Sequence, residues 1–134
     1  MIFVCAMTMA QTNAYPLLPM PQNYKVTDKS FAMGKVKLST PVLKSEWEAF
    51  IVNAGGELAD KAAAEIKVEL LPVIDGVKLN PDEAYRLSVS GKLIKIEAVT
   101  ERGVYWALQT LRQLEKKKGK KSLFAGCEIV DWPA

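Results

Sequence analysis

Apolar and polar residues alternate along four segments of the chain, and this period of two is typical of strands with one buried and one exposed face. The alternating segments are residues 34–40, 66–71, 85–90 and 93–98. Pro41 and Pro72 end the first two, and only Gly91-Lys92 separates the last two. Because a two-residue loop that opens with glycine suits a type II′ turn, the last two segments are predicted to form a β-hairpin. Residues 127–130 predict one further strand.

Two other segments carry apolar residues at helical spacing. The first begins at Ser45, which is a suitable N-cap, and is predicted to be helical to about Ala54. Gly55-Gly56 interrupts its pattern, and a glycine costs a helix interior about 1 kcal/mol relative to alanine. A bend or a second helical piece through Ala64 is therefore expected.

A second helix is predicted over residues 101–114, with Thr100 as its N-cap. Its apolar stripe, which is expected to face the core, consists of Val104, Ala107, Leu108, Leu111 and Leu114. At about 100° per residue, Trp106 falls on the opposite side of this helix. Its neighbours there are the polar residues Gln109, Thr110 and Gln113. Because tryptophan is enriched at interfaces, we hypothesise that Trp106 docks the helix on a neighbouring domain; a tolerated exposed aromatic residue is the alternative.

The composition suits one compact domain. The chain has 134 residues, of which 49% are hydrophobic, and single domains cluster around about 100–150 residues. Much of its net charge of +3 comes from lysines at residues 116–121, directly after the second predicted helix. Cations there oppose the partial negative charge of a helix C-terminus, so a solvated helix end and loop is expected. Since no aromatic residue interleaves the lysines, no nucleic-acid partner is expected.

The sequence lacks the groups that usually hold a metal or run a reaction. There is no histidine, so a zinc site would need carboxylates alone, and neither a metal nor a cofactor is expected. A thiol nucleophile would need a base that this chain does not contain, so Cys127 is predicted to be a buried strand residue. The other cysteine, Cys5, is far from it in sequence. There is also no glycine-rich phosphate loop and no Gly-x-Ser-x-Gly motif.

Residues 1–14 combine a short apolar stretch with a zone of small residues, which is typical of a signal peptide, here with a truncated basic start. The apolar stretch is too short to cross a bilayer, so no integral membrane segment is expected. An N-terminal core strand is the alternative. Three prolines within residues 15–22 then favour an extended entry segment, with a proline-rich ligand for another protein as the alternative.

Two motifs carry a resemblance to a known family. They are residues 103–114, GVYWALQTLRQL, and residues 129–134, IVDWPA. Both resemble the accessory domain that precedes the catalytic barrel in family 20 glycoside hydrolases, the β-N-acetylhexosaminidases. Pro19-Met20-Pro21 is similar to the opening of that domain, and the resemblance extends over residues 15–134.

The resemblance implies an α+β fold, with a mainly antiparallel sheet and two helices packed on one face. Residues 15–130 would form a non-catalytic domain, and residues 131–134 would begin the linker into a catalytic barrel. The parent enzyme would hydrolyse terminal N-acetylhexosamine residues of glycans and would be exported to the periplasm, the extracellular space or the cell surface. The partners implied are the chain's own C-terminal barrel and the glycan substrate. The residues expected to face the barrel are Trp106, Gln109, Gln113 and Trp132.

Other functions stay open at this point. Related accessory domains precede the barrels of family 84 O-GlcNAc hydrolases and some glucuronidases, and a stand-alone glycan- or protein-binding module is a further alternative. The tryptophans lie on helices and at the end of the sequence, not on a strand face, which weighs against a glycan platform. In family 20 an adjacent Asp-Glu pair is catalytic, but the only such pair here, Asp82-Glu83, lies in a predicted turn of the accessory segment. We therefore assign no catalytic residue.

Overall fold

The computed structural model of the protein describes residues 23–132 except residues 28, 76 and 78–80. In this part of the chain, seven strands form a main sheet in the order β1-β10-β6-β7-β5-β3-β4. They are β1 (Asn23–Val26), β3 (Lys35–Ser39), β4 (Glu57–Leu58), β5 (Ala64–Leu70), β6 (Tyr85–Val89), β7 (Leu93–Ala98) and β10 (Cys127–Asp131). A smaller sheet, in the order β2-β9-β8, consists of β2 (Phe31–Ala32), β8 (Glu115–Lys118) and β9 (Lys121–Phe124).

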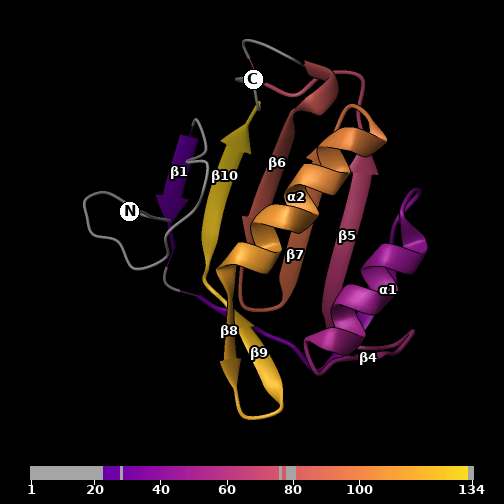
Figure 1. Cartoon of the computed structure of the whole chain (residues 1–134), viewed down its shortest axis with the longest axis vertical. Helices are drawn as coiled ribbons and strands as arrows, with labels where there is room; N and C mark the ends of the chain where they lie inside the picture. Colours follow the sequence, from indigo (N-terminus) through magenta and orange to yellow (C-terminus); the bar gives the residue numbers. More distant parts are fainter. Residues whose placement is uncertain (1–22, 28, 76, 78–80, 133–134) are drawn as a thin grey trace.

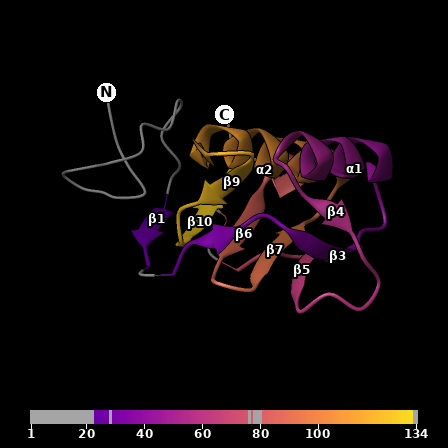
Figure 2. The same cartoon turned by 90° about the horizontal axis from the view of Figure 1, so that it is seen from below.

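Both helices of the described residues, α1 (Lys44–Asn53) and α2 (Glu101–Leu114), cover the same face of the main sheet (Figures 1 and 2). The predicted α+β class with two helices on one face is therefore confirmed. The sheet is mixed: β4, β3, β5 and β7 pair in parallel, whereas β7, β6, β10 and β1 pair antiparallel. The parallel pairing of β3 with β5 follows from the connection through α1, because a helical crossover returns the chain in the direction of the first strand.

The predicted hairpin sits in the middle of this sheet. Strands β6 and β7 pair in the register Leu87↔Ile96, and a bond from Ser90 N to Leu93 O, 2.9 Å long, closes the turn. The strand expected at residues 127–130 is β10, which lies between β1 and β6. The period of two in the sequence thus predicted the central strands correctly.

Side chains alternate along each strand, so the two faces of the main sheet differ in character. Toward the helices lies the apolar core, with fully buried residues that include Ile66, Leu87, Ile94, Ile96 and Ile129. The opposite face carries charged side chains. Lys95 Nζ lies 3.7 Å from Glu69 Oε1 and 3.6 Å from Glu97 Oε2. Such partly exposed pairs contribute under about 1 kcal/mol each, and their main effect is to make this face suited to water.

Helix α1 differs from its prediction at its N-terminal end. It begins at Lys44, and its N-cap is Leu43 in the left-handed conformation, with φ 55° and no side-chain cap bond, so Ser45 is not the cap. It ends at Asn53, and of the two predicted alternatives the bend is found: a turn at Ala54-Gly55 leads into β4 and a loop, with no second helical piece before Ala64.

Gly55 explains why α1 stops. Its φ is +84°, a backbone conformation that residues other than glycine rarely adopt. A Cβ at this position would also lie 2.0 Å from the Lys120 carbonyl oxygen. The chain therefore leaves the helix where its backbone touches the small sheet. A bond from Ser122 N to Ala54 O, 3.0 Å long, fixes that contact.

The lysine cluster forms the β8–β9 hairpin, so the prediction of a loop was wrong. Helix α2 ends at Leu114 as predicted, and the chain passes directly into β8, whose register includes Lys118↔Lys121. Long-range partners stabilise this hairpin, such as the 2.9 Å bond from Met33 N to Ser122 O. Lys117 Nζ donates to Asn53 O at 2.9 Å, so a lysine does oppose a helix C-terminus, but that of α1.

The predicted signal peptide (1–14) and the proline-rich entry segment (15–22) lie outside the described residues. Among the described residues, no helix has the length and hydropathy that a membrane span requires.

Candidate interface on the helical face

The outward side of α2 displays two aromatic rings. Tyr105 is 46% exposed and Trp106 is 37% exposed, and their rings meet edge to face at 71° with centroids 5.5 Å apart. Trp106 Nε1 donates to Glu83 Oε1 at 3.0 Å, so the indole is held at the surface by its own domain. The helical period correctly placed Trp106 outside the core. The same count also places Tyr105, the residue before it, outside the apolar stripe, a signal not used in the prediction.

The polar part of the predicted interface follows along α2. Gln109 is half-buried and its Oε1 accepts a bond from Arg112 at 3.4 Å, while Gln113 is exposed one turn after Gln109. Helix α1 adds Val52, which is 62% exposed near its C-terminal end. The helical side of the domain thus combines aromatic, aliphatic and amide groups.

Thr110 does not belong to this surface, which corrects the prediction that grouped it with the polar residues. It is buried, and its Oγ1 lies 2.6 Å from the Tyr85 hydroxyl. Burial raises the pKa of Tyr85, so the phenol is neutral and can share a proton with Thr110. The threonine therefore joins α2 to β6 inside the core.

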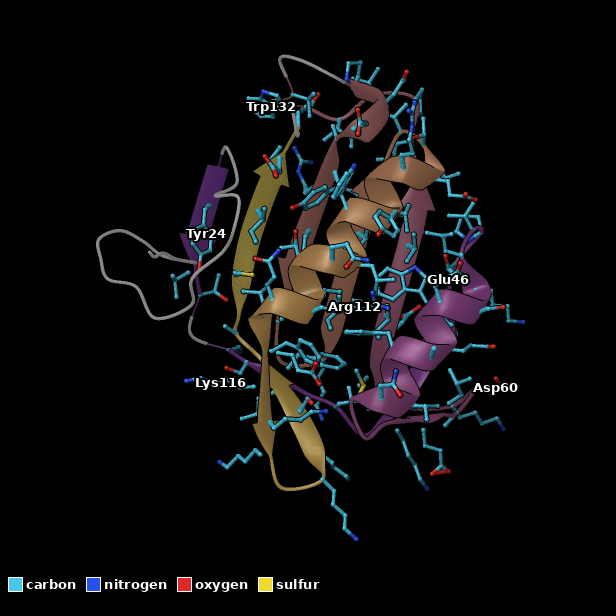
Figure 3. All side chains as sticks on the ribbon, in the orientation of Figure 1. Tyr24, Glu46, Asp60, Arg112, Lys116 and Trp132 are labelled. Carbon is cyan, nitrogen blue, oxygen red and sulfur yellow. The ribbon has the colours of Figure 1, made fainter. Side chains whose placement is uncertain are left out.

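Trp132 differs from the other three predicted interface residues in being buried. It is 8% exposed and packs with Ile74 and Ala84 in a small cluster at the end of β10. In Figure 3 it stands at one end of the sheet, whereas Arg112, in the last turn of α2, lies away from that end. The structure brings Trp106, Gln109 and Gln113 onto one helix surface and buries Trp132 against Ile74 and Ala84, and the interface role of all four stays a prediction.

Candidate reactive groups occupy structural positions. Asp82-Glu83 forms part of the 3-10 helix Pro81–Glu83, where the Asp82 carbonyl oxygen accepts a bond from the Thr100 hydroxyl. Thr100 is at the N-cap of α2 as predicted, but its side chain makes this contact instead of a cap bond. Cys127 is fully buried, as predicted, and burial raises the pKa of its thiol to about 12. Within the described residues, no group of side chains could hold a metal ion.

Comparison with protein families identifies the fold. The family model "Glycosyl hydrolase family 20, domain 2" matches residues 14–132, nearly the whole chain. The chain belongs to this family. No protein with a curated description matches this chain.

Solved structures share the fold of this family 20 domain. The domain is 28% identical to an exo β-N-acetylglucosaminidase from Vibrio harveyi, with a TM-score of 0.68 over 95% of this chain and 20% of that one. A β-N-acetylhexosaminidase from Bacteroides fragilis is 19% identical, with a TM-score of 0.62 over 86% of this chain and 24% of that one. The protein named CpGH84B has the same fold at 17% identity, with a TM-score of 0.69 over 88% of this chain and 22% of that one. The family 20 domain thus spans about a fifth to a quarter of the chains that it resembles.

The structure gives a physical reason for the identity of two motif residues in this family 20 domain, one steric and one polar. Gly103 opens the α2 motif because a Cβ there would lie 2.2 Å from the Ala84 carbonyl oxygen. Asp131 is buried at the end of β10, and its Oδ1 accepts the backbone N–H of Trp132 at 3.0 Å. These motifs therefore position α2 and the end of the sheet.

Proposed function

We propose that this chain is the non-catalytic accessory domain of an exported β-N-acetylhexosaminidase. Its helical face packs against the catalytic barrel of the same polypeptide, and the barrel alone binds the glycan and cleaves its terminal N-acetylhexosamine. The family 20 assignment supports this function directly. The 28% identity to the Vibrio harveyi enzyme supports the same choice.

The distribution of exposed apolar side chains carries the proposal. Large exposed apolar residues among the described part of the chain include Val52 on α1 and Tyr105 and Trp106 on α2. By strand alternation, none of the exposed large apolar residues lies on the open face of the main sheet, where Lys95, Glu69 and their neighbours form ion pairs. A charged, ion-paired face suits water and an aromatic helical face suits a protein partner, so the barrel belongs on the helical side.

The same aromatic geometry disfavours a glycan-binding module. Sugar rings stack on flat aromatic platforms, whereas Tyr105 and Trp106 stand at 71° to each other. Trp47 is fully buried in the core, and Trp132 is nearly so. The accessory domain of a family 84 enzyme is disfavoured because CpGH84B shares only the fold, at 17% identity, whereas the matched family model is that of family 20.

The experiment compares the 134-residue chain with the longer native gene product, each with Tyr105 and Trp106 replaced by alanine. In the isolated chain the double variant should lower stability by about 1–2 kcal/mol, because each side chain is partly covered and Trp106 loses its bond to Glu83. In the longer protein it should shorten the half-life of hexosaminidase activity on heating several-fold, with KM unchanged.

Lys37→Ala, on the exposed part of the opposite face, is the control and should change neither property. An equal destabilisation of the isolated chain and the longer protein would contradict the docking role. A changed KM with unchanged heat stability would instead indicate that these aromatic residues contact the glycan.

A further inference from the structure

The β8–β9 hairpin concentrates the positive charge of the whole protein. Residues 115–121 contain five lysines and one glutamate, a net charge of +4, compared with +3 for the complete chain. The rest of the protein is thus slightly acidic on balance. The hairpin projects beyond one end of the main sheet, opposite the end where the described chain finishes (Figure 1). Lys116, which is labelled in Figure 3, lies at this end.

The two faces of the hairpin are used differently. On the face toward α1, Lys117 Nζ lies 3.0 Å from Glu115 Oε2 and donates to Asn53 O, so its charge is neutralised. Lys118 and Lys121 lie on the other face, directly opposite each other in the register. Like charges in that position destabilise a hairpin, and no acidic residue among the described part of the chain forms an ion pair with either one.

This lysine face has a composition that excludes most specific ligands. It contains no arginine to bind a single phosphate or carboxylate in a bidentate manner and no aromatic ring on which a base or sugar could stack. Two surface pockets, one beside Ile74 and one beside Cys127, are lined by residues outside the hairpin. The surface therefore offers point charges on a projecting tip, which fits an extended layer of negative charge.

We propose that the lysine face of the hairpin, formed by Lys118 and Lys121 with Lys120 in the turn between them, binds the protein peripherally to an anionic lipid surface. Polybasic segments bind such surfaces through the summed attraction of individual lysines, and neither a pocket nor a fixed geometry is required. This inference does not depend on the proposed hydrolase function, because it concerns only the charge of the hairpin.

The test measures co-sedimentation of the 134-residue chain with vesicles of phosphatidylcholine alone or mixed in equal parts with phosphatidylglycerol. We expect binding to the mixed vesicles only, and its loss when ionic strength rises from about 0.05 M to about 0.5 M. Replacing Lys118, Lys120 and Lys121 by glutamine should weaken binding on the order of 100-fold, since each lysine contributes about fivefold near an anionic surface.

A matched control replaces the exposed lysines Lys37, Lys61 and Lys92 by glutamine, which changes the net charge equally. If the position of the lysines determines binding, and not the total charge, the affinity of this control variant for the mixed vesicles should lie within about threefold of the wild-type affinity. Arginine at the three hairpin positions should preserve binding, and the glutamine variant should melt at or above the wild-type temperature, because the opposed like charges are gone.

Three results would overturn the proposal. They are no binding to the mixed vesicles, equal losses in the hairpin and control variants, and binding to soluble heparin or polyphosphate without binding to vesicles. The last result would assign the lysine face to a soluble polyanion instead.

Discussion

Gly103 decides how closely α2 can approach the strands beneath it. A Cβ at this position would lie 2.2 Å from the Ala84 carbonyl oxygen and 2.9 Å from the Ala98 Cβ, both in rigid surroundings. We predict that Gly103→Ala lowers the free energy of unfolding by about 1–3 kcal/mol, although alanine is the better helix former. Urea denaturation measures this loss. Gly34→Ala is the control, because its new Cβ would meet only the Lys121 Nζ at 3.8 Å, and an equal loss there would refute the steric argument.

The Tyr85–Thr110 hydrogen bond is a second contact that links α2 to the sheet. Tyr85→Phe or Thr110→Val removes this buried hydrogen bond and should cost about 1–3 kcal/mol. The double variant should cost clearly less than the sum of the two, because it removes both partners together. Additive losses in a thermal double-mutant cycle would show that the two hydroxyls do not interact.

Cys127 should be unreactive while the domain is folded, since its side chain is buried and the pKa of its thiol is raised to about 12. The ionised form is disfavoured only in the folded state, so this group's stabilising effect is complete below the ordinary thiol pKa of about 8.5 and is lost as pH rises toward 12. In a Cys5→Ser background, labelling by a thiol reagent at pH 8 should follow the rate of unfolding. Fast labelling of the native protein would contradict the buried position.

At the scale of elements, Glu115 ties the end of α2 to the β8–β9 hairpin. Burial alone would raise its pKa, but hydrogen bonds from Ser122 and Lys117 outweigh burial, so the pKa of Glu115 lies below its usual value. A carboxylate with a lowered folded pKa stabilises the protein above its unfolded pKa of about 4.3, and the effect is lost as pH falls through the folded value. We predict that Glu115→Gln reduces the acid dependence of the melting temperature in this range. An unchanged pH profile would contradict this assignment.

The elements that could be predicted from the sequence are those whose pattern is long and local. Helix α2 and the β6–β7 hairpin have ten or more patterned residues each, and both formed as predicted. The strands β2 and β4 have two residues each, which is too short for any periodicity to appear. The β8–β9 hairpin escaped prediction because charge dominates its sequence while its stabilising bonds go to Ala54 and Met33, far away along the chain.

In the candidate interface too, the features set by a local pattern could be predicted and those set by distant contacts could not. The helical period alone places Trp106 outside the core, and the structure agrees. Thr110 was assigned to the surface because its buried partner, Tyr85, lies on another element. Trp132 is likewise covered by a residue from a distant segment, Ile74. A local pattern therefore predicts which side of a helix a residue occupies, but not which distant group covers it.

At the scale of the whole molecule, the domain has three distinct surfaces. The helical side is aromatic and aliphatic, the open side of the main sheet is charged and ion-paired, and the lysine hairpin projects at one end. Figure 2 shows both helices on one side of the sheet. This division suits a domain that packs one side on a protein partner and leaves the others in water. The family 20 assignment identifies that partner, in our proposal, as a hydrolase barrel.

The coding sequence downstream of Ala134 in the native gene is the most direct test of this account. The account predicts that it continues for about 250 residues or more, the length of a catalytic barrel, with an adjacent Asp-Glu pair at the end of a predicted barrel strand. A stop codon within a few codons of Ala134 would contradict it. The helical face would then need a separate protein as its partner.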